Sequence, residues 1–152
     1  MSKEKKVILA IDQASHCGWA LSKDLYGVWD LTTKKDEDMG MKLIRFRNKL
    51  KEVCTSEGVE MIVYERVAGM HTASIIHAAK MVAIIETFCT ENGINYTAFS
   101  AQEVKKFATG KGNANKDAMV KAAQEQYGYP GTDDNVADAL HIWHLATKNF
   151  NQ

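Results

Sequence analysis

The sequence predicts an α/β fold with a mixed five-stranded sheet, in which three strands are antiparallel and two are parallel, flanked by helices. Three observations predict it. Short apolar runs occur along the chain with longer stretches of helical periodicity between the later ones. The first three runs are joined by short loops, which is typical of an antiparallel meander. The two later runs each follow a helical stretch, as in an α/β domain. At 152 residues the chain is expected to form a single domain, 1–152.

Five apolar runs are expected to form the strands. The first, Val7–Ile11, is apolar throughout, as in a strand buried on both faces, and it ends in the carboxylate of Asp12. A carboxylate at the end of a central strand is costly unless something pairs with it. The fourth run ends in the same way, at Glu65. The remaining strands are expected at Gly18–Ser22, Tyr26–Leu31, Val59–Tyr64 and Ile94–Phe99.

Five stretches are expected to form helices. They are an amphipathic helix that ends near Gly58, a helix over 72–92, one capped by Ser100, one over 114–127 and a last one that begins near Thr132. We interpret the basic face of the first helix, which carries Lys42, as a solvated surface rather than a binding site. The helix over 72–92 is apolar on nearly every side. We therefore expect it to pack on the sheet and against a second subunit, giving a homodimer.

The composition sets broad limits on location and partners. The apolar content of 45% and charged content of 25% are ordinary for a soluble globular protein. We expect no secretory leader and no membrane-spanning stretch. Three widely spaced cysteines favour reduced thiols and a cytoplasmic location. The net charge of zero argues only weakly against nucleic-acid binding, because charge can be segregated along the surface.

Three acidic residues stand where the predicted elements would bring them together. Asp12 and Glu65 each end a strand, and Asp138 lies on the last helix, with Asn135 and Asp134 about one turn earlier. If the two strands are parallel neighbours, their carboxyl ends meet at the edge where open α/β sheets bind ligands. Oxygen ligands without clustered cysteine or histidine favour Mg²⁺, with Mn²⁺ as a substitute, over zinc. Two such ions activate water and stabilise the leaving oxygen of a phosphodiester.

Each acidic residue also has an ordinary explanation. Asp12 can belong to a turn, Glu65 can pair with Arg66, and acidic residues at 133 and 134 favour a helix N-terminus. Each of these explanations is the better one when its residue is taken alone. The three residues together, at the ends of the predicted elements, favour a metal site.

Four segments resemble RuvC-type Holliday junction resolvases, and together they cover nearly the whole chain. The segments are IDQASHCGWAL, VYERV, SAQEVKKFATGKGNANKDAMV and DDNVADALHIWH. The resemblance implies an RNase H-like fold, a homodimer and Mg²⁺-dependent cutting of four-way DNA junctions. The length and divergence look more like the phage-encoded members, for which the location would be the host cytoplasm.

The resemblance also implies the metal ligands and the residues that act in catalysis. Asp12, Glu65 and Asp138 match the catalytic and metal-ligand positions, with two Mg²⁺ ions in each active site. The fourth acidic position of the family falls on Asn135, whose amide oxygen can still bind a metal but brings no charge. Asp134, the adjacent residue, is the alternative ligand.

The lysine-containing segment between the second and last motifs is expected to contact DNA. Lys105 and Lys116 match family lysines that lie near the DNA backbone. With Lys106 and Lys111 they make a local positive surface, and nearby glycines let phosphates approach closely. An ordinary exposed loop with lysines is the alternative interpretation.

The sequence departs from the family in two places. Gln13 and Ala14 stand where many members have Pro-Gly. The aromatic residue thought to wedge into the junction is replaced by Ala68, and Met70 or His71 are candidates to take its place. Selectivity for four-way over other branched DNA is therefore open, as are the sequence preference at the cut and the protein partners.

Two histidines and two rival functions are also left open. His141 lies one turn after Asp138 and either orients that carboxylate or packs at the surface, whereas His77 is expected to be structural. A nuclease acting on RNA or flaps would use the same carboxylates. A non-catalytic junction-binding protein would result if Asn135 disables the metal site.

Overall fold

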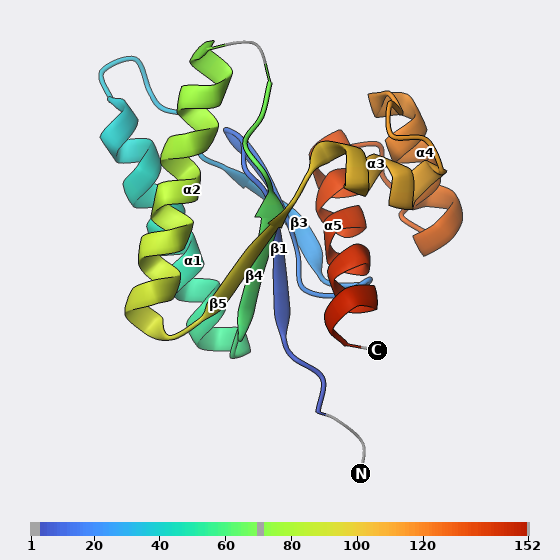
Figure 1. The fold of residues 1–152 in the computed structure, drawn as a ribbon. Helices are drawn as coiled ribbons and strands as arrows, with labels where there is room; N and C mark the ends of the chain where they lie inside the picture. The colour runs from blue at the N-terminus through green and yellow to red at the C-terminus, as the bar shows by residue number, and fades with distance from the viewer. Residues whose placement is uncertain (1–3, 70–71, 152) are drawn as a thin grey trace.

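The computed structural model describes residues 4–69 and 72–151 and contains the predicted mixed sheet of five strands (Figure 1). The strand order is β3-β2-β1-β4-β5, which places β1 in the centre. β1 pairs antiparallel with β2 and parallel with β4, β2 pairs antiparallel with β3, and β4 pairs parallel with β5. The strands are β1 (Ile8–Asp12), β2 (His16–Ala20), β3 (Tyr26–Asp30), β4 (Met61–Glu65) and β5 (Asn95–Phe99).

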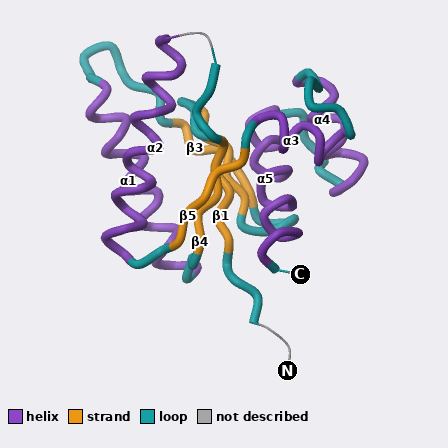
Figure 2. The backbone as a smooth tube through the Cα atoms, in the orientation of Figure 1, coloured by secondary structure: helices purple, strands orange, loops and turns teal. Residues whose placement is uncertain are grey.

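Five helices cover the two faces of this sheet (Figure 2). α1 and α2 lie on one face, and α3, α4 and α5 lie on the other (Figure 1). The helices are α1 (Met39–Glu57), α2 (Thr72–Asn92), α3 (Ala101–Thr109), α4 (Lys116–Tyr127) and α5 (Asp134–Phe150).

The core consists of two apolar clusters separated by the sheet. Leu9 and Ile11 of β1 pack with α1 and α2 on one face. Ile8 and Ala10 point the other way and pack with α3, α4 and α5. Because successive side chains of a strand alternate between faces, β1 contributes to both clusters. This explains why its apolar run is continuous.

Helix ends follow the capping residues, and these explain the shifted boundaries. Ser100 forms the predicted cap of α3, as a full capping box with Glu103. Gly58 ends α1 in the left-handed conformation at φ 65°. The last helix begins at Asp134 rather than near Thr132, because the Asp133 carboxylate accepts hydrogen bonds from the first backbone N–H groups of α5.

β2 also differs from its predicted range. It begins at His16 and ends at Ala20, two residues earlier than expected. The reason is its pairing with β3, in which His16 lies opposite Asp30 and Ala20 lies opposite Tyr26. The loop between β1 and β2 is therefore shorter than predicted, because β2 begins at His16 rather than at Gly18.

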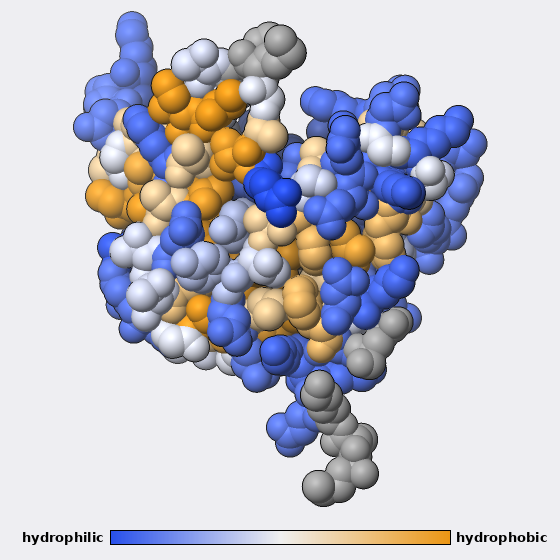
Figure 3. All heavy atoms as spheres, in the orientation of Figure 1, coloured by the Kyte–Doolittle hydropathy of each residue, from blue (hydrophilic) through white to orange (hydrophobic). Residues whose placement is uncertain are grey.

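Helix α2 corrects the expectation that no stretch is long and apolar enough to span a membrane. By length and composition alone it meets that requirement, as the core helix of a soluble protein also can. Only 22% of its most apolar stretch is buried, and Ile76 is 50% exposed. Figure 3 shows apolar residues gathered over this helix. One side of α2 packs on the sheet through Met81 and Ile85, and the rest leaves an apolar surface uncovered.

Candidate active site

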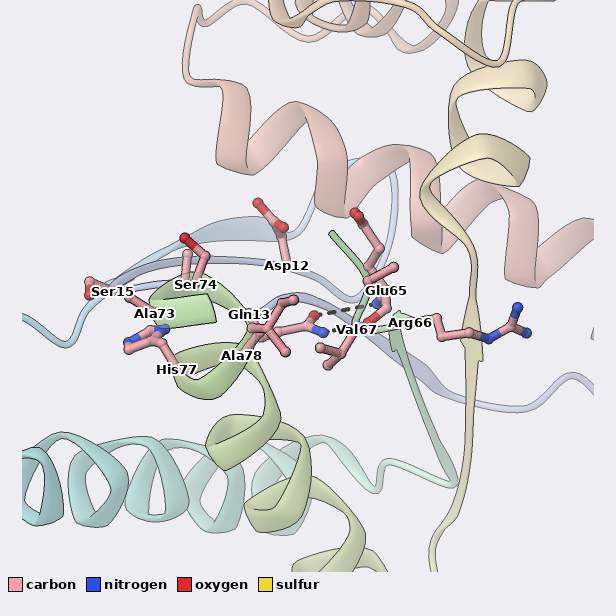
Figure 4. A pocket seen from close by; sticks show the side chains of 13 residues that line it. Asp12, Gln13, Ser15, Glu65, Arg66, Val67, Ala73, Ser74, His77 and Ala78 are labelled. Carbon is pink, nitrogen blue, oxygen red and sulfur yellow. Dashed lines mark hydrogen bonds between the residues drawn. The ribbon is translucent and has the colours of Figure 1, made fainter. Parts of the chain in front are cut away.

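The central strands place two of the predicted carboxylates side by side. β1 and β4 run parallel, with Ile11 opposite Tyr64, so Asp12 and Glu65 follow at the same edge of the sheet. Both side chains are partly buried and line a cavity of about 520 Å³. Figure 4 shows the two carboxylates pointing to the same side of the sheet. The prediction that the strand ends bring them together is confirmed.

Asp138 reaches this edge from α5, which packs across β1 and β2. The close approach depends on Gly18 of β2, because a Cβ atom there would lie 2.1 Å from the backbone oxygen of Asn135. Any side chain at this position would push away the first turn of α5. Asp138 lies one turn further along the helix, half-buried, so its place also depends on this contact.

The pKa values show that the three carboxylates influence one another. Burial raises the pKa of Asp12 well above its ordinary value, and the charges of Asp138 and Glu65 raise it further. Burial followed by the charge of Glu65 raises the pKa of Asp138 to about 7. Burial also raises the pKa of Glu65, and Lys105 partly offsets this effect. A group of partly buried carboxylates with raised pKa values is stabilised by a bound cation.

The donor set fits a hard divalent ion by its chemistry, although its side chains are not gathered around one point. Within residues 4–69 and 72–151, no three side chains of His, Cys, Asp or Glu stand close enough together to hold one ion as they are placed. A divalent cation would draw them together.

Asp134 and Asn135 differ in their charge and in their contacts near Asp12 and Asp138. The Asp134 carboxylate lies 3.6 Å from Lys116 Nζ, and its charge raises the pKa of both Asp12 and Asp138. Asn135 is half-buried with its backbone against Gly18. Asp134 therefore adds negative charge near Asp12 and Asp138, whereas Asn135 adds none.

The predicted DNA-binding lysines fall into two groups. Lys105 and Lys116 lie close enough to the carboxylates to lower the pKa of Asp138. Lys106 instead lines a separate hollow with Phe107 and Lys148, because consecutive helix residues point about 100° apart. Lys111 is exposed in the loop between α3 and α4. Lys105 and Lys116 are therefore placed beside the candidate site, whereas Lys106 points elsewhere.

Gln13 positions Glu65 in a way that the sequence did not reveal. Its side-chain amide donates to the backbone oxygen of Glu65 and accepts from the backbone N–H of Glu65 at 3.3 Å. The amide thus extends the β1–β4 pairing by one residue through a side chain. This pairing fixes the end of β4. The departure at Gln13 therefore has a structural role.

The interpretation of His141 is wrong, whereas the structural role expected for His77 stays a prediction. His141 neither packs at the surface nor orients Asp138: it is fully buried, and its two ring nitrogens bond to the Tyr127 hydroxyl and the Met119 backbone oxygen. His77 lines the cavity that holds Asp12 and Glu65. A histidine on an apolar helix gives no sequence signal for either environment.

The junction-wedge position is partly described. Ala68 is exposed and lines the same cavity. A methyl group offers little surface for stacking on a base. The candidate replacements, Met70 and His71, lie outside the described residues.

The raised pKa of Asp138 predicts how stability depends on pH without metal. Between the ordinary aspartate value of 3.8 and about 7, the folded protein keeps a proton on Asp138 that the unfolded chain has released. Stability in chelator should therefore fall as pH rises from 5 to 8, by on the order of 2 kcal/mol. Asp138→Asn should reduce this loss and be more stable than the parent at pH 8.

Urea unfolding at pH 5 and pH 8 measures this effect. Added Mg²⁺ should restore the stability of the parent at pH 8 and have a smaller effect on Asp138→Asn. A parent protein that gains stability in chelator between pH 5 and pH 8 would contradict the clustering of these carboxylates.

This chain is similar in sequence to proteins of one known family. Residues 8–144 match the family model of the crossover junction endodeoxyribonuclease RuvC. RuvC of Brachyspira hyodysenteriae is 27% identical over 148 residues, covering 90% of each chain. RuvC of Streptomyces coelicolor is 27% identical over 134 residues, covering 82% of this chain and 71% of its own.

Solved structures show the same fold. The Thermus thermophilus RuvC structure superposes with a TM-score of 0.73 at 18% identity, covering 93% of this chain and 95% of its own. The T. thermophilus RuvC complex with Holliday junction substrate gives a TM-score of 0.70, also at 18% identity, covering 89% and 88%. The yeast mitochondrial Holliday junction resolvase Ydc2 gives 0.60 at 14% identity, covering 98% and 83%.

The fold is RNase H-like, as the sequence predicted. Within that class, the chain belongs to the RuvC family of crossover junction endodeoxyribonucleases. Nucleases of this family depend on metal ions.

Proposed function

We propose that the protein cuts four-way DNA junctions by metal-dependent hydrolysis of phosphodiester bonds. The observation that carries this proposal is the edge of the β1–β4 pair, where Asp12 and Glu65 share one cavity and couple electrostatically to Asp138. Membership of the RuvC family supports the substrate.

In this proposal Asp12, Glu65 and Asp138 would hold two Mg²⁺ ions, with Asn135 or Asp134 as a further oxygen ligand and Mn²⁺ as a substitute. Bound there, such ions supply an activated water and stabilise charge on the leaving oxygen. The protein's own contribution is placement. Burial and mutual repulsion raise the carboxylate pKa values. A bound cation therefore stabilises the ionised form of these groups more than it stabilises exposed carboxylates.

Lys105 and Lys116 would hold the cleaved strand by its phosphates. Both lie beside the carboxylates and offset part of their negative charge. Phosphate contacts of this kind set the register of DNA on a protein without reading its sequence. They would lead the scissile phosphate toward the edge where Asp12 and Glu65 stand.

We also propose that two copies associate through α2, since its uncovered apolar side needs a partner. Ile76 on α2 and Ile44 on α1 are 50% and 54% exposed. Lys80 and Glu86 interrupt this surface, which favours a protein partner over a lipid bilayer. A twofold dimer presents two active sites to the two symmetric strands of a junction. Sedimentation equilibrium tests directly whether the protein is a dimer.

The cytoplasmic location stays a prediction from composition.

The test uses end-labelled four-way junction, three-way junction, linear duplex and RNA–DNA hybrid, each incubated with Mg²⁺, Mn²⁺ or chelator. Paired symmetric cuts in the four-way junction, absent in chelator, are the expected result. Cutting of every branched form would indicate a broader debranching nuclease. Binding without cutting in any metal would overturn the proposal and favour a junction-binding protein, disabled by the missing charge at Asn135.

A further inference from the structure

Ser15 and His77 line the active-site cavity apart from the carboxylates, and Lys42 contacts both of them from outside the lining. Lys42 of α1 donates a hydrogen bond to Ser15 Oγ at 2.7 Å, and its Nζ lies 3.2 Å from His77 Nε2. Ser15 and His77 both line the cavity that holds Asp12 and Glu65. Figure 4 shows Ser15 and His77 at one end of this cavity, with Asp12 between them and Glu65. We call these three residues the Lys42 cluster.

The hydrogen positions in the Lys42 cluster leave three donors unused. An ammonium group only donates, so Ser15 Oγ and His77 Nε2 must both accept from Lys42. His77 is then neutral, with its proton on Nδ1, which agrees with a pKa lowered by burial and by Lys42. The Ser15 hydroxyl hydrogen, the His77 Nδ1–H and the third N–H of Lys42 find no acceptor among the residues that the structure describes.

The charge of Lys42 is also uncompensated. Arg45, one turn along α1, is paired with Glu37. In the described part of the chain, by contrast, no carboxylate lies within 4 Å of Lys42 Nζ. Lys42 is half-buried and has no carboxylate partner, and two further hydrogen-bond donors lie next to it. An oxyanion could accept hydrogen bonds from these donors and balance the positive charge.

We propose that Ser15, Lys42 and His77 form a second phosphate-binding position for the DNA strand that enters the cavity. This inference rests on the proposed function. Lys105 acts on Glu65 and Asp138 from α3, whereas Ser15 and His77 lie beyond Asp12 at the opposite end of the cavity (Figure 4). The strand would therefore be held by cationic groups on both sides of the carboxylates. Such a grip fixes the scissile phosphate along the strand as well as across it.

A purely structural role is the competing explanation, because Lys42 also ties α1 to α2 and to the β1–β2 connection. The two roles differ in what they predict for DNA. A structural tie affects the folded state and all DNA contacts alike. A phosphate contact affects the salt dependence of binding and one particular linkage of the strand.

The experiment compares Lys42→Met with Lys42→Arg and with the matched control Lys49→Met, an exposed lysine of the same helix. Binding of the full protein to a four-way junction is measured in chelator over a series of salt concentrations. Lys42→Met should weaken binding about tenfold and lower the slope of log affinity against log salt by about one. Lys42→Arg should keep the slope, and Lys49→Met should match the parent.

Neutral methylphosphonate linkages placed singly along the strand then locate the contact. One linkage near the cut should weaken binding to the parent and have no further effect on Lys42→Met. If Lys42→Met does not fold, Ser15→Ala removes one donor without a charge change, and it should lose sensitivity to the same linkage.

Equal salt slopes for Lys42→Met and Lys49→Met, or linkage effects that are the same in variant and parent, would overturn this inference while leaving junction cleavage intact. A parent protein that fails to bind the junction would instead overturn the proposed function, and this inference with it.

Discussion

Replacing Glu65 with glutamine is expected to lower junction cleavage at least about 1000-fold while leaving junction binding intact. The substitution keeps the size of the side chain and removes the charge that a divalent ion needs. The backbone of Glu65 should stay in place, because Gln13 holds its N–H and carbonyl groups rather than its side chain. Cleavage rates and binding affinities on the same labelled junction separate the two effects.

Glu52→Gln is the matched control for this experiment. Glu52 is exposed on α1, so the same change of charge there should leave cleavage unchanged. If a folded Glu65→Gln protein lost junction binding as well, the division between Glu65 for chemistry and the lysines for DNA binding would be wrong.

Gly18→Ala is expected to cost about 3 kcal/mol of folding stability and to lower cleavage as well. The added methyl carbon would meet the Asn135 backbone at 2.1 Å and 2.5 Å, which requires the start of α5 to move. Helix backbone cannot yield as a flexible side chain does. Because Asp138 is carried on the same helix, the carboxylates would also lose their relative placement. Thermal unfolding and cleavage by the fraction that remains folded measure the two effects.

Gly112→Ala provides the comparison. Its added Cβ would lie 3.8 Å from Gln102, an ordinary contact, so the stability should change by no more than about 0.5 kcal/mol. A Gly18→Ala protein as stable as Gly112→Ala would show that α5 does not rest on β2 as described.

Much of the fold was predictable because its signals are local. Strands buried on both faces leave continuous apolar runs, and helices leave periodic ones. The carboxylate pair was predictable as well, since Asp12 and Glu65 each follow such a run and parallel strands align their ends. The position of Asp138 near this pair was predictable because the last helix was expected to pack on the same sheet.

The contacts between side chains were not predictable in the same way. Gln13 pairs with a backbone 52 residues away, and Lys42 meets His77 across 35 residues. Neither pairing leaves a periodic or local pattern in the sequence. His141 was misjudged for the same reason, because its partners come from α4, an element whose packing on α5 the sequence does not specify.

The membership of β1 in both core clusters has a consequence for local unfolding. α1 and α2 can loosen without disturbing the cluster on the other face, and α4 can do the same on its own side. β1 cannot open until both clusters break, so its amides should be among the slowest to exchange with solvent. Asp12 is the last residue of β1, and Glu65 is the last residue of the neighbouring strand β4. Transient opening of the outer helices would therefore leave the spacing of these two carboxylates unchanged.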